Sequence, residues 1–441
     1  RVCANPRDVN ISIGLRIDHV ASRHIPTGSG TGRRSPKHFA GHVAILDRTC
    51  SNLIPWPPAR PREDAILNFG FSEEQEHLRR EARKWIDEHC PLREVREIAE
   101  TPLGHSPELW KQLGELGWLG LTVDEGHGGS GLDWEDLVVL LEETGRTLFP
   151  SPLLSTTLAA RALSRWGTPA QQQRWLPNLA NGSCIGTLAL FDESDRLTPG
   201  AIQTSASQQG ENLVLLGDKT HVPDACAADL LVVAYRTRAG AQDLGLALVE
   251  ANAEGLSLTP RSSLDGTRRL ADVQLQNLSV KPENQLELPS DGWAAIQDLI
   301  DCGALGVAAE AIGTAEGAMA MTVQYAKDRV QFGSPIGHFQ GVKHPLAEMY
   351  MEIESLKSLV YYGAWTIRSR PEETASAAAQ AKAFAAEVLT RIGVGCIQLH
   401  GAIGYTLEHD VQLYLKRSKW VRPMYGDENH HYERISVMGN V

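Results

Sequence analysis

Three features that define other protein classes are missing from this sequence. No apolar stretch reaches the roughly 18 residues that a membrane-spanning helix needs. Positive charge is not in excess, because the formal net charge is −12, which argues against nucleic acid or an anionic membrane surface as the main partner. The seven cysteines form no CxxC pair and no regular spacing: Cys3, Cys50, Cys90, Cys184, Cys226, Cys302 and Cys396. These absences predict a cytoplasmic protein with reduced thiols, no zinc site and no disulfide framework.

The first 65 residues also lack the periodicity of a folded segment. They are rich in Arg, Pro, Ser and Gly, as in "PTGSGTGRRSPKHF", and the first methionine of the chain is Met319. A transit peptide is poor in acidic residues, so Asp8, Asp18 and Asp47 fit that class badly. We therefore expect residues 1–65 to be a disordered leader or a spurious extension, and we exclude them from the fold.

The rest of the chain changes its apolar period twice. Residues 66–186 are helical in pattern and begin with a capping box formed by Ser72 and Gln75. Residues 187–285 contain short β-branched or alternating runs such as "DLLVVAYR". Residues 286–441 return to the helical period, with a Gly- and Ala-rich stretch at 303–320, a final helix near 409–421 and a polar tail. We predict an α+β multidomain protein with an N-terminal all-α domain, a middle β-barrel or sandwich domain and a C-terminal four-helix bundle.

The second long helix of the bundle carries the clearest apolar pattern. One continuous stripe is predicted along it, from residues spaced by three and four: Leu346, Met349, Ile353, Leu356, Val360 and Ala364. A Gly-Ser-Pro-Ile-Gly break separates this helix from the preceding one, and an Arg and a Phe stand directly before the break.

Three segments, in this order around the β-domain, resemble the acyl-CoA dehydrogenase family. They are residues 113–146 ("LGELGWLGLTVDEG…"), 325–349 ("YAKDRVQFGSPIGHFQG…") and 397–419 ("IQLHGAIGYTLEHD…"). The resemblance covers roughly residues 68–441 and implies the fold predicted above, an FAD cofactor and α,β-dehydrogenation of an acyl-CoA thioester. It also implies dimers or dimers of dimers that share each flavin across a subunit interface, with an electron-transfer flavoprotein as the usual electron acceptor.

The same resemblance implies a set of cofactor residues. Arg329 would offer a bidentate, permanent charge to the pyrophosphate of a neighbouring subunit's FAD. The other implied contacts to that FAD are Gln331, Phe332, Phe339, Gln340, Gln398, His400, Gly401 and Ala402, although the family more often has a second glycine at the place of Ala402. The alternative for Arg329 is that its charge only complements the C-terminal end of a helix.

The catalytic base is missing from both places where the family puts it. By resemblance, the reaction needs a carboxylate that removes the α-proton. That carboxylate usually follows a Tyr near the C-terminus, but here Gly426 follows Tyr425, and the second family position is Gly303. Asp427 stands one residue further on, at the family's usual interval from a downstream Arg, and Glu428 follows it. Asp427 as base, Glu428 as base, or no base in this chain all remain open.

The middle domain also lacks residues that the family has at its active site. His221 and Pro223 stand where the resemblance implies a Trp beside the flavin ring and a Thr that bonds it, and proline has neither an N–H nor a hydroxyl. We infer that this chain has lost family residues around its own flavin ring but has kept most residues that would contact the FAD of a neighbouring subunit. His430 and His431 are interpreted as turn or flavin-adjacent polar residues, not metal ligands. A further cluster, Glu142, Glu143 and Arg146, is interpreted as a solvated helix face.

Three hypotheses for the function follow. The first is an FAD-dependent acyl-CoA dehydrogenase of lipid or sterol side-chain degradation that uses Asp427 as its base. The second is a weakly or non-catalytic partner subunit of a hetero-oligomeric acyl-CoA dehydrogenase. The third is a flavin-free scaffold that binds acyl-CoA.

Overall fold

The computed structural model describes residues 71–192, 197–237 and 243–439, so the predicted leader lies outside the described residues. The N-terminal region is helical: α1 (Glu73–His89), α2 (Leu92–Ala99), α3 (Pro107–Glu115), α4 (Trp134–Arg146), α5 (Leu153–Trp166) and α6 (Pro169–Ala180). The predicted capping box is confirmed, since Ser72 Oγ accepts from the Gln75 N–H at 3.2 Å and Gln75 Oε1 accepts from the Ser72 N–H at 3.0 Å. No described helix combines the length and the apolarity that crossing a bilayer requires.

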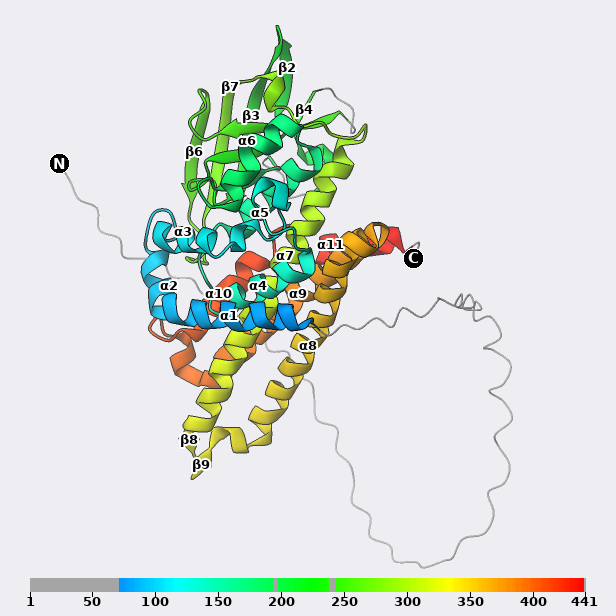
Figure 1. Cartoon of the computed structure of the whole chain (residues 1–441). Coiled ribbons are helices and arrows are strands. Elements are labelled where there is room, and N and C mark those ends of the chain that lie inside the picture. The colour runs from blue at the N-terminus through cyan, green and yellow to red at the C-terminus, as the bar shows by residue number, and fades with distance from the viewer. Residues whose placement is uncertain (1–70, 193–196, 238–242, 440–441) are drawn as a thin grey trace, which may run out of the picture. The chain divides into compact units, whose positions relative to one another are not determined.

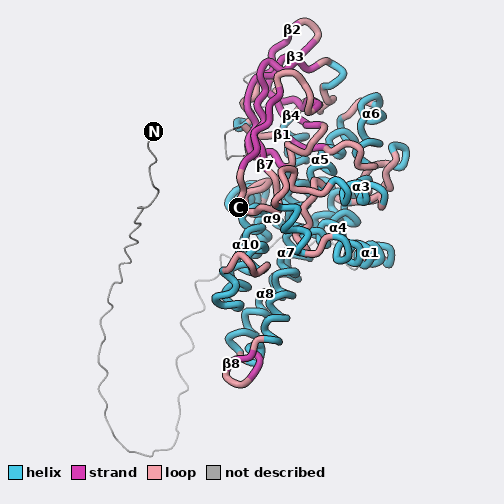
Figure 2. Tube along the Cα trace, turned by 90° about the vertical axis from the view of Figure 1, so that its left-hand side faces the viewer, coloured by secondary structure: helices cyan, strands magenta, loops and turns pink. Residues whose placement is uncertain are grey.

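The middle region is one mixed seven-stranded sheet (Figures 1 and 2). Its strands are β1 (Gly186–Ala189), β2 (Ser205–Gln209), β3 (Asn212–Pro223), β4 (Leu230–Arg236), β5 (Leu244–Glu250), β6 (Leu256–Arg261) and β7 (Leu270–Val280). The strand order is β1-β4-β2-β3-β7-β6, with β5 paired to the other side of β4. β1 and β4 run parallel, whereas β3, β7 and β6 form antiparallel pairs.

Both faces of the sheet are buried at β4, which explains why this strand has no polar alternation. Along β4, Leu230, Val232 and Ala234 belong to the large core shared with the helices. Leu231 and Val233 belong to a second core that the sheet encloses by itself. Successive side chains of a strand point to opposite faces, so the run "LLVVA" supplies both cores.

The C-terminal region contains α7 (Gly292–Asp328), α8 (Gln340–Ser369), α9 (Pro371–His400), α10 (Val411–Val421) and α11 (Glu428–Met438). A short hairpin of β8 (Val330–Gln331) and β9 (Ser334–Pro335) joins α7 to α8 at the tip of the bundle (Figure 1). The predicted stripe on α8 is confirmed, because Met349, Ile353, Leu356, Val360 and Ala364 are buried and Leu346 packs against the same core.

The glycines of α7 allow α4 to lie directly on its backbone. A Cβ built on Gly313 would stand 1.8 Å from the Glu142 carbonyl oxygen, and one built on Gly145 would stand 2.1 Å from the Glu310 carbonyl oxygen. Only glycine permits so close an approach, so these glycines are what brings the two helices into backbone contact. Through this contact the N-terminal helices and the bundle share one core.

Two predictions about individual segments are wrong. The polar tail after residue 421 contains α11, whose polar residues cap the helix and pair with other elements instead of facing water alone. The supposedly solvated face of α4 is buried, because Glu142 and Glu143 accept hydrogen bonds from Arg79 and Arg83 of α1. Buried carboxylates need such partners, and the partners lie about 60 residues away in the sequence.

Candidate functional site

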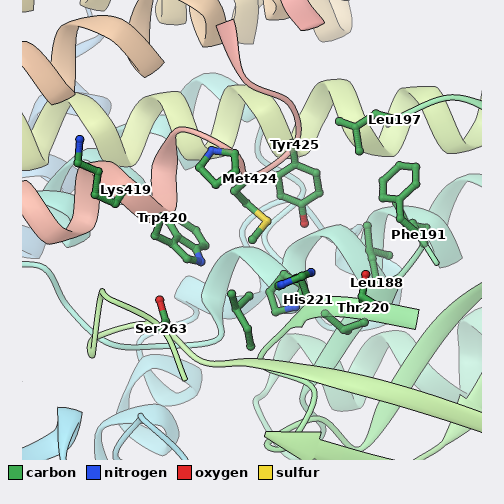
Figure 3. Close-up of a pocket in the computed structure, with 15 residues that line it drawn as sticks. Leu188, Phe191, Leu197, Thr220, His221, Ser263, Lys419, Trp420, Met424 and Tyr425 are labelled. Carbon is green, nitrogen blue, oxygen red and sulfur yellow. The ribbon is translucent and has the colours of Figure 1, made fainter. Parts of the chain in front are cut away.

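A cavity of about 350 Å³ lies between the sheet and the C-terminal end of α10 (Figure 3). The sheet side contributes residues around the ends of β1, β3 and β7, and the other side contributes residues 419–425. Its lining is mainly apolar and aromatic: Leu188, Leu190, Phe191, Leu197, Thr220, His221, Val222, Pro223, Ser263, Leu270, Lys419, Trp420, Pro423, Met424 and Tyr425. A concave apolar site with a few polar groups is the usual form of a small-molecule site.

The sheet side of the cavity is shaped by a β-bulge and by a buried lysine. The register of β3 against β7 shifts between Lys219 and Val222, and His221 adopts a positive φ of 54°, which turns its side chain to the cavity. Lys219 is fully buried and donates to the Leu190 carbonyl oxygen and to Asp192 Oδ2, both at 3.1 Å. Burial lowers the pKa of Lys219 to about 8, and these two bonds hold the segment after β1 against β3.

The opposite wall includes Trp420, which two buried arginines support. The guanidinium of Arg268 lies 4.9 Å from the centre of the indole, and that of Arg417 lies 5.9 Å from it. Arg417 Nε donates to Asp265 Oδ2 at 2.6 Å, and Arg268 Nη2 donates to Glu310 Oε2 of α7. The wall is therefore fixed by ion pairs that connect α10, the loop before β7 and α7.

Tyr425 fills the end of the cavity that lies against α7. It adopts a positive φ of 55°, and a Cβ built on Gly303 would stand 2.8 Å from three of its ring carbons. The His431 imidazole donates from Nε2 to the Tyr425 carbonyl oxygen at 2.9 Å. A positive φ in a non-glycine residue is unfavourable unless its surroundings fix it, and here a glycine of α7 and a histidine of α11 do so.

A second buried lysine holds the turn that carries this tyrosine. Lys382 of α9 is fully buried, and its Nζ donates to the carbonyl oxygens of Arg422 at 2.9 Å and of Gly426 at 2.6 Å. These carbonyls lie on either side of Tyr425 in the sequence. Burial lowers the pKa of Lys382 to about 7, against the smaller effect of the nearby Asp427 and Glu428 carboxylates.

The two predicted base candidates have other partners. Asp427 is the N-cap of α11, and its Oδ1 accepts from the His430 N–H at 2.9 Å. Glu428 accepts from Arg422 Nε at 2.9 Å, and this pairing lowers the pKa of the Glu428 carboxyl. Neither residue belongs to the lining of the cavity, and among the described residues no aspartate or glutamate does. The catalytic role of Asp427 or Glu428 stays a prediction.

Other carboxyl groups stand close in the sequence to residues that line the cavity, among them Asp192, which Lys219 bonds. Asp224 follows Pro223, and its Oδ2 accepts from Ser155 Oγ at 2.5 Å; burial raises the pKa of Asp224 to about 6, but the residue does not line the cavity. Glu193 and Asp195 lie outside the described residues. In the described part of the chain, no cluster of three His, Cys, Asp or Glu side chains has the arrangement of a metal site.

The predicted cofactor residues meet at the other end of the bundle. Arg329 ends α7, Gln331 and Phe332 form the hairpin, and Phe339 and Gln340 begin α8 (Figure 1). The remaining predicted residues, Gln398, His400, Gly401 and Ala402, end α9 or begin the turn after it. The two groups are linked, since the His400 ring stacks on Tyr325 of α7 with 4.6 Å between ring centres.

The chemistry of this end fits a dinucleotide. Within the described part of the chain, no hydrogen bond or ion pair occupies the Arg329 guanidinium, and Phe332 is 91% exposed. Gly333 and Gly401 have φ of 77° and 65°, with open space where a side chain would be. His400 Nε2 is buried without a partner. A free guanidinium, exposed aromatic rings and bare backbone are what a pyrophosphate and an adenosine need.

This end and the cavity are too far apart to serve one cofactor within a single chain. Gly303, which touches the Tyr425 ring, lies 26 positions before Arg329 along α7 and its cap. At about 1.5 Å per residue the two positions are about 40 Å apart, more than an extended FAD can span. If Arg329 binds a flavin, that flavin belongs to the ring site of another subunit.

The sequence interpretation gave no role to Trp420 and Tyr425, which line the cavity, or to Lys382, which holds the turn beside it. Lys382 is the one charged residue of the alanine-rich segment 374–386, which is a signal that could have been used. Tyr425 and Trp420 gave no such signal, because an aromatic residue near a chain end is equally compatible with a core position. Their role depends on α7 and on the loop before β7, which meet them only after folding.

The comparisons with known proteins agree with this architecture. The profile "Acyl-CoA dehydrogenase, N-terminal domain" matches residues 72–183, and "Acyl-CoA dehydrogenase, C-terminal domain" matches residues 290–437. The acyl-CoA dehydrogenase IpdE2 of Mycolicibacterium smegmatis is 34% identical over 368 residues, which cover 83% of this chain and 99% of that protein.

Solved structures give the same result. A Tcur3481–Tcur3483 steroid ACAD variant is 30% identical, with a TM-score of 0.76 and coverage of 83% of this chain and 98% of that chain. The ChsE4–ChsE5 complex from Mycobacterium tuberculosis is 27% identical, with a TM-score of 0.77 and coverage of 85% and 99%. The chain belongs to the acyl-CoA dehydrogenase family.

Proposed function

We propose that this chain is a subunit of a hetero-oligomeric, FAD-dependent acyl-CoA dehydrogenase. Members of the family are flavoprotein oxidoreductases of β-oxidation. In the proposed assembly this chain binds the adenosine and pyrophosphate part of a partner's FAD, and the partner supplies the base that removes the α-proton. Bound FAD supplies hydride-accepting chemistry. A cytoplasmic location and an electron-transfer flavoprotein as acceptor belong to the same proposal.

The observation that carries the proposal is the difference between the two ends of the bundle. The cavity has no carboxylate among its described lining residues, and both nearby carboxylates of residues 427–428 have structural partners. The Arg329 guanidinium, in contrast, lies about 40 Å away and is bonded to no side chain of the described residues. A chain that keeps the charge for another subunit's cofactor, and shows no base in its own cavity, fits a partner role better than independent catalysis.

The solved relatives support the paired composition. One is described as a Tcur3481–Tcur3483 steroid ACAD and another as a complex of ChsE4 with ChsE5, so each name joins two different chains. By analogy we propose a second acyl-CoA dehydrogenase-like chain as partner and a bulky lipid or sterol side-chain acyl-CoA as substrate. The apolar lining of the cavity is compatible with such an acyl group.

Flavin content tests the proposal. The full chain is purified alone and together with a neighbouring acyl-CoA dehydrogenase-like chain, and FAD per complex is measured by absorbance. We expect little flavin on the chain alone and stable flavin in the complex. Arg329→Ala is expected to lower FAD occupancy of the complex severalfold, whereas Arg80→Ala, at an exposed position of α1, removes the same charge and leaves occupancy unchanged.

Asp427→Asn separates the partner role from independent catalysis. Asparagine keeps an oxygen that caps α11, so the fold is preserved while the carboxylate is lost. Under the proposal, acyl-CoA still bleaches the flavin of the complex carrying this variant. Loss of bleaching with full flavin content would instead identify Asp427 as the base. A yellow chain that is reduced by acyl-CoA without any partner would also refute the proposal.

A further inference from the structure

The hydroxyl of Tyr425 is an unused hydrogen-bond donor inside the cavity. The residue is 9% exposed and lines the cavity, and no hydrogen bond joins its hydroxyl to any described residue. Figure 3 shows the hydroxyl on the cavity side of the ring, directed toward Thr220 and His221. The hydroxyl oxygen is not one of the buried atoms without a partner, so it faces the open space of the cavity, where an acceptor atom of a ligand can bond it.

The donor is held in one position before any ligand binds. The ring lies on Gly303, where even one methyl group would collide with it. The backbone is fixed by His431 at the Tyr425 carbonyl and by Lys382 at the carbonyls of Arg422 and Gly426. The tyrosine is already held in one conformation in the folded chain. A ligand that bonds the hydroxyl therefore does not lose binding free energy to ordering the tyrosine.

The phenol also stays protonated. Burial raises the pKa of the Tyr425 hydroxyl above its usual value, and the Asp224 and Glu310 carboxylates add to the effect. By resemblance the family's carboxylate follows this tyrosine, where Gly426 stands here, so the hydroxyl that this cavity presents is a neutral group that donates a hydrogen bond. Such a group selects ligands and does not remove an α-proton.

We propose that Tyr425 is a specificity-determining residue whose hydroxyl donates a hydrogen bond to a carbonyl oxygen of the ligand in the cavity. Most of the surrounding lining is apolar, including Leu188, Leu190 and Phe191, so the fitting ligand is an apolar skeleton with a carbonyl group near one end. This inference rests on the proposed function, in that the occupant belongs to an acyl-CoA dehydrogenase. The carbonyl can be a ketone of the acyl group, the thioester carbonyl or a carbonyl of a flavin ring.

A matched pair of ligands tests the proposal. The dissociation constants of 4-oxocyclohexanecarboxyl-CoA and cyclohexanecarboxyl-CoA, which differ by one ketone, are measured by calorimetry on the full chain and on its complex. If the acceptor is an acyl ketone, the wild type binds the ketone about tenfold more tightly, as one buried hydrogen bond provides. Tyr425→Phe keeps the ring and brings this ratio to about one. Tyr350→Phe, which removes a hydroxyl at a position that is 54% exposed, keeps the wild-type ratio.

The other two sources of the carbonyl give different results with the same variant. A thioester acceptor makes Tyr425→Phe weaken both ligands by about the same factor of ten, with FAD occupancy unchanged. A flavin acceptor would belong to an FAD other than the one that Arg329 holds, because the two positions lie about 40 Å apart. In that case both acyl-CoA constants stay unchanged, while Tyr425→Phe weakens binding of the FAD in this cavity about tenfold and shifts its absorption maximum.

One result overturns the proposal. If Tyr425→Phe changes neither the acyl-CoA constants nor FAD binding, the hydroxyl bonds no ligand carbonyl. This failure differs from failure of the proposed function, which appears as flavin and turnover on the chain without a partner. Binding constants do not depend on which subunit carries the base, so the two outcomes are measured separately.

Discussion

Replacing Gly303 by alanine tests the contact between α7 and the cavity. The new methyl carbon would stand 2.8 Å from three carbons of the Tyr425 ring, well inside the separation of nonbonded carbon atoms. The ring cannot move away freely, because the turn that carries it is bonded to Lys382 and His431. We expect overpacking of this kind to lower the free energy of unfolding by about 1–3 kcal/mol.

The sign of this effect should reverse when the ring is absent. In a Tyr425→Ala background the collision disappears, and alanine is better than glycine in a helix interior by about 1 kcal/mol. Gly303→Ala should therefore destabilise the wild type and stabilise the Tyr425→Ala protein. The coupling free energy of the double-mutant cycle is then about 2–4 kcal/mol, large for a glycine and a tyrosine separated by more than 100 residues.

Urea unfolding of the four proteins in the cycle measures this coupling. Tryptophan fluorescence and circular dichroism are followed on the same samples, and the midpoints are compared at fixed pH and protein concentration. If Gly303→Ala lowers the midpoint equally in both backgrounds, the tyrosine is not what the methyl group meets. The arrangement of the cavity end, and the ligand role inferred from it, would then be wrong.

Two further predictions concern buried charges. Burial lowers the pKa of Lys382 to about 7, below the value of about 10.4 in an unfolded chain. Between these two pH values the unfolded state binds more protons than the folded state. The contribution of Lys382 to the free energy of unfolding therefore rises with pH from about 7 to 10. Lys382→Met should flatten that rise in urea midpoints measured at pH 7 and 9; an unchanged slope would contradict the assignment. Arg79→Met leaves Glu142, which is 1% exposed, without its ion-pair partner and should lower the free energy of unfolding by about 3 kcal/mol. Arg93→Met, at an exposed pair, should cost less than about 1 kcal/mol, and equal losses for the two variants would refute the argument.

The cavity and the bundle tip explain how one chain can lose part of an active site and keep its fold. Trp420 is fixed by Arg268 and Arg417, whose own partners belong to the shared core, so the wall does not depend on catalytic residues. Arg329 is the C-cap residue of α7, next to the hairpin, and its guanidinium forms no ion pair with any described residue. Under the proposed function, Arg329 is present because it binds the FAD of a partner subunit.

The helix that begins at Glu428 shows how local signals can be misjudged. Asp427 followed by Glu428 is a helix start signal, with an N-cap oxygen and an acidic first turn, and the structure uses it in that way. From the sequence alone, the same aspartate was a candidate base in a polar tail. The sequence pattern was compatible with both interpretations, because an N-cap and a catalytic carboxylate are both polar residues beside a glycine.

Sequence patterns were enough to predict the order of helical, β and helical regions, the capping box at Ser72, the apolar stripe of α8 and the family. These features depend on periods of two or 3.6 residues and on near neighbours in the chain, both of which are visible in the sequence. The burial of Glu142, the capping role of Asp427 and the contact between the Tyr425 ring and Gly303 arise only when the chain is folded. Burial and side-chain direction depend on partners distant in the sequence, so the sequence alone could not decide which polar side chains face the cavity and which one caps a helix.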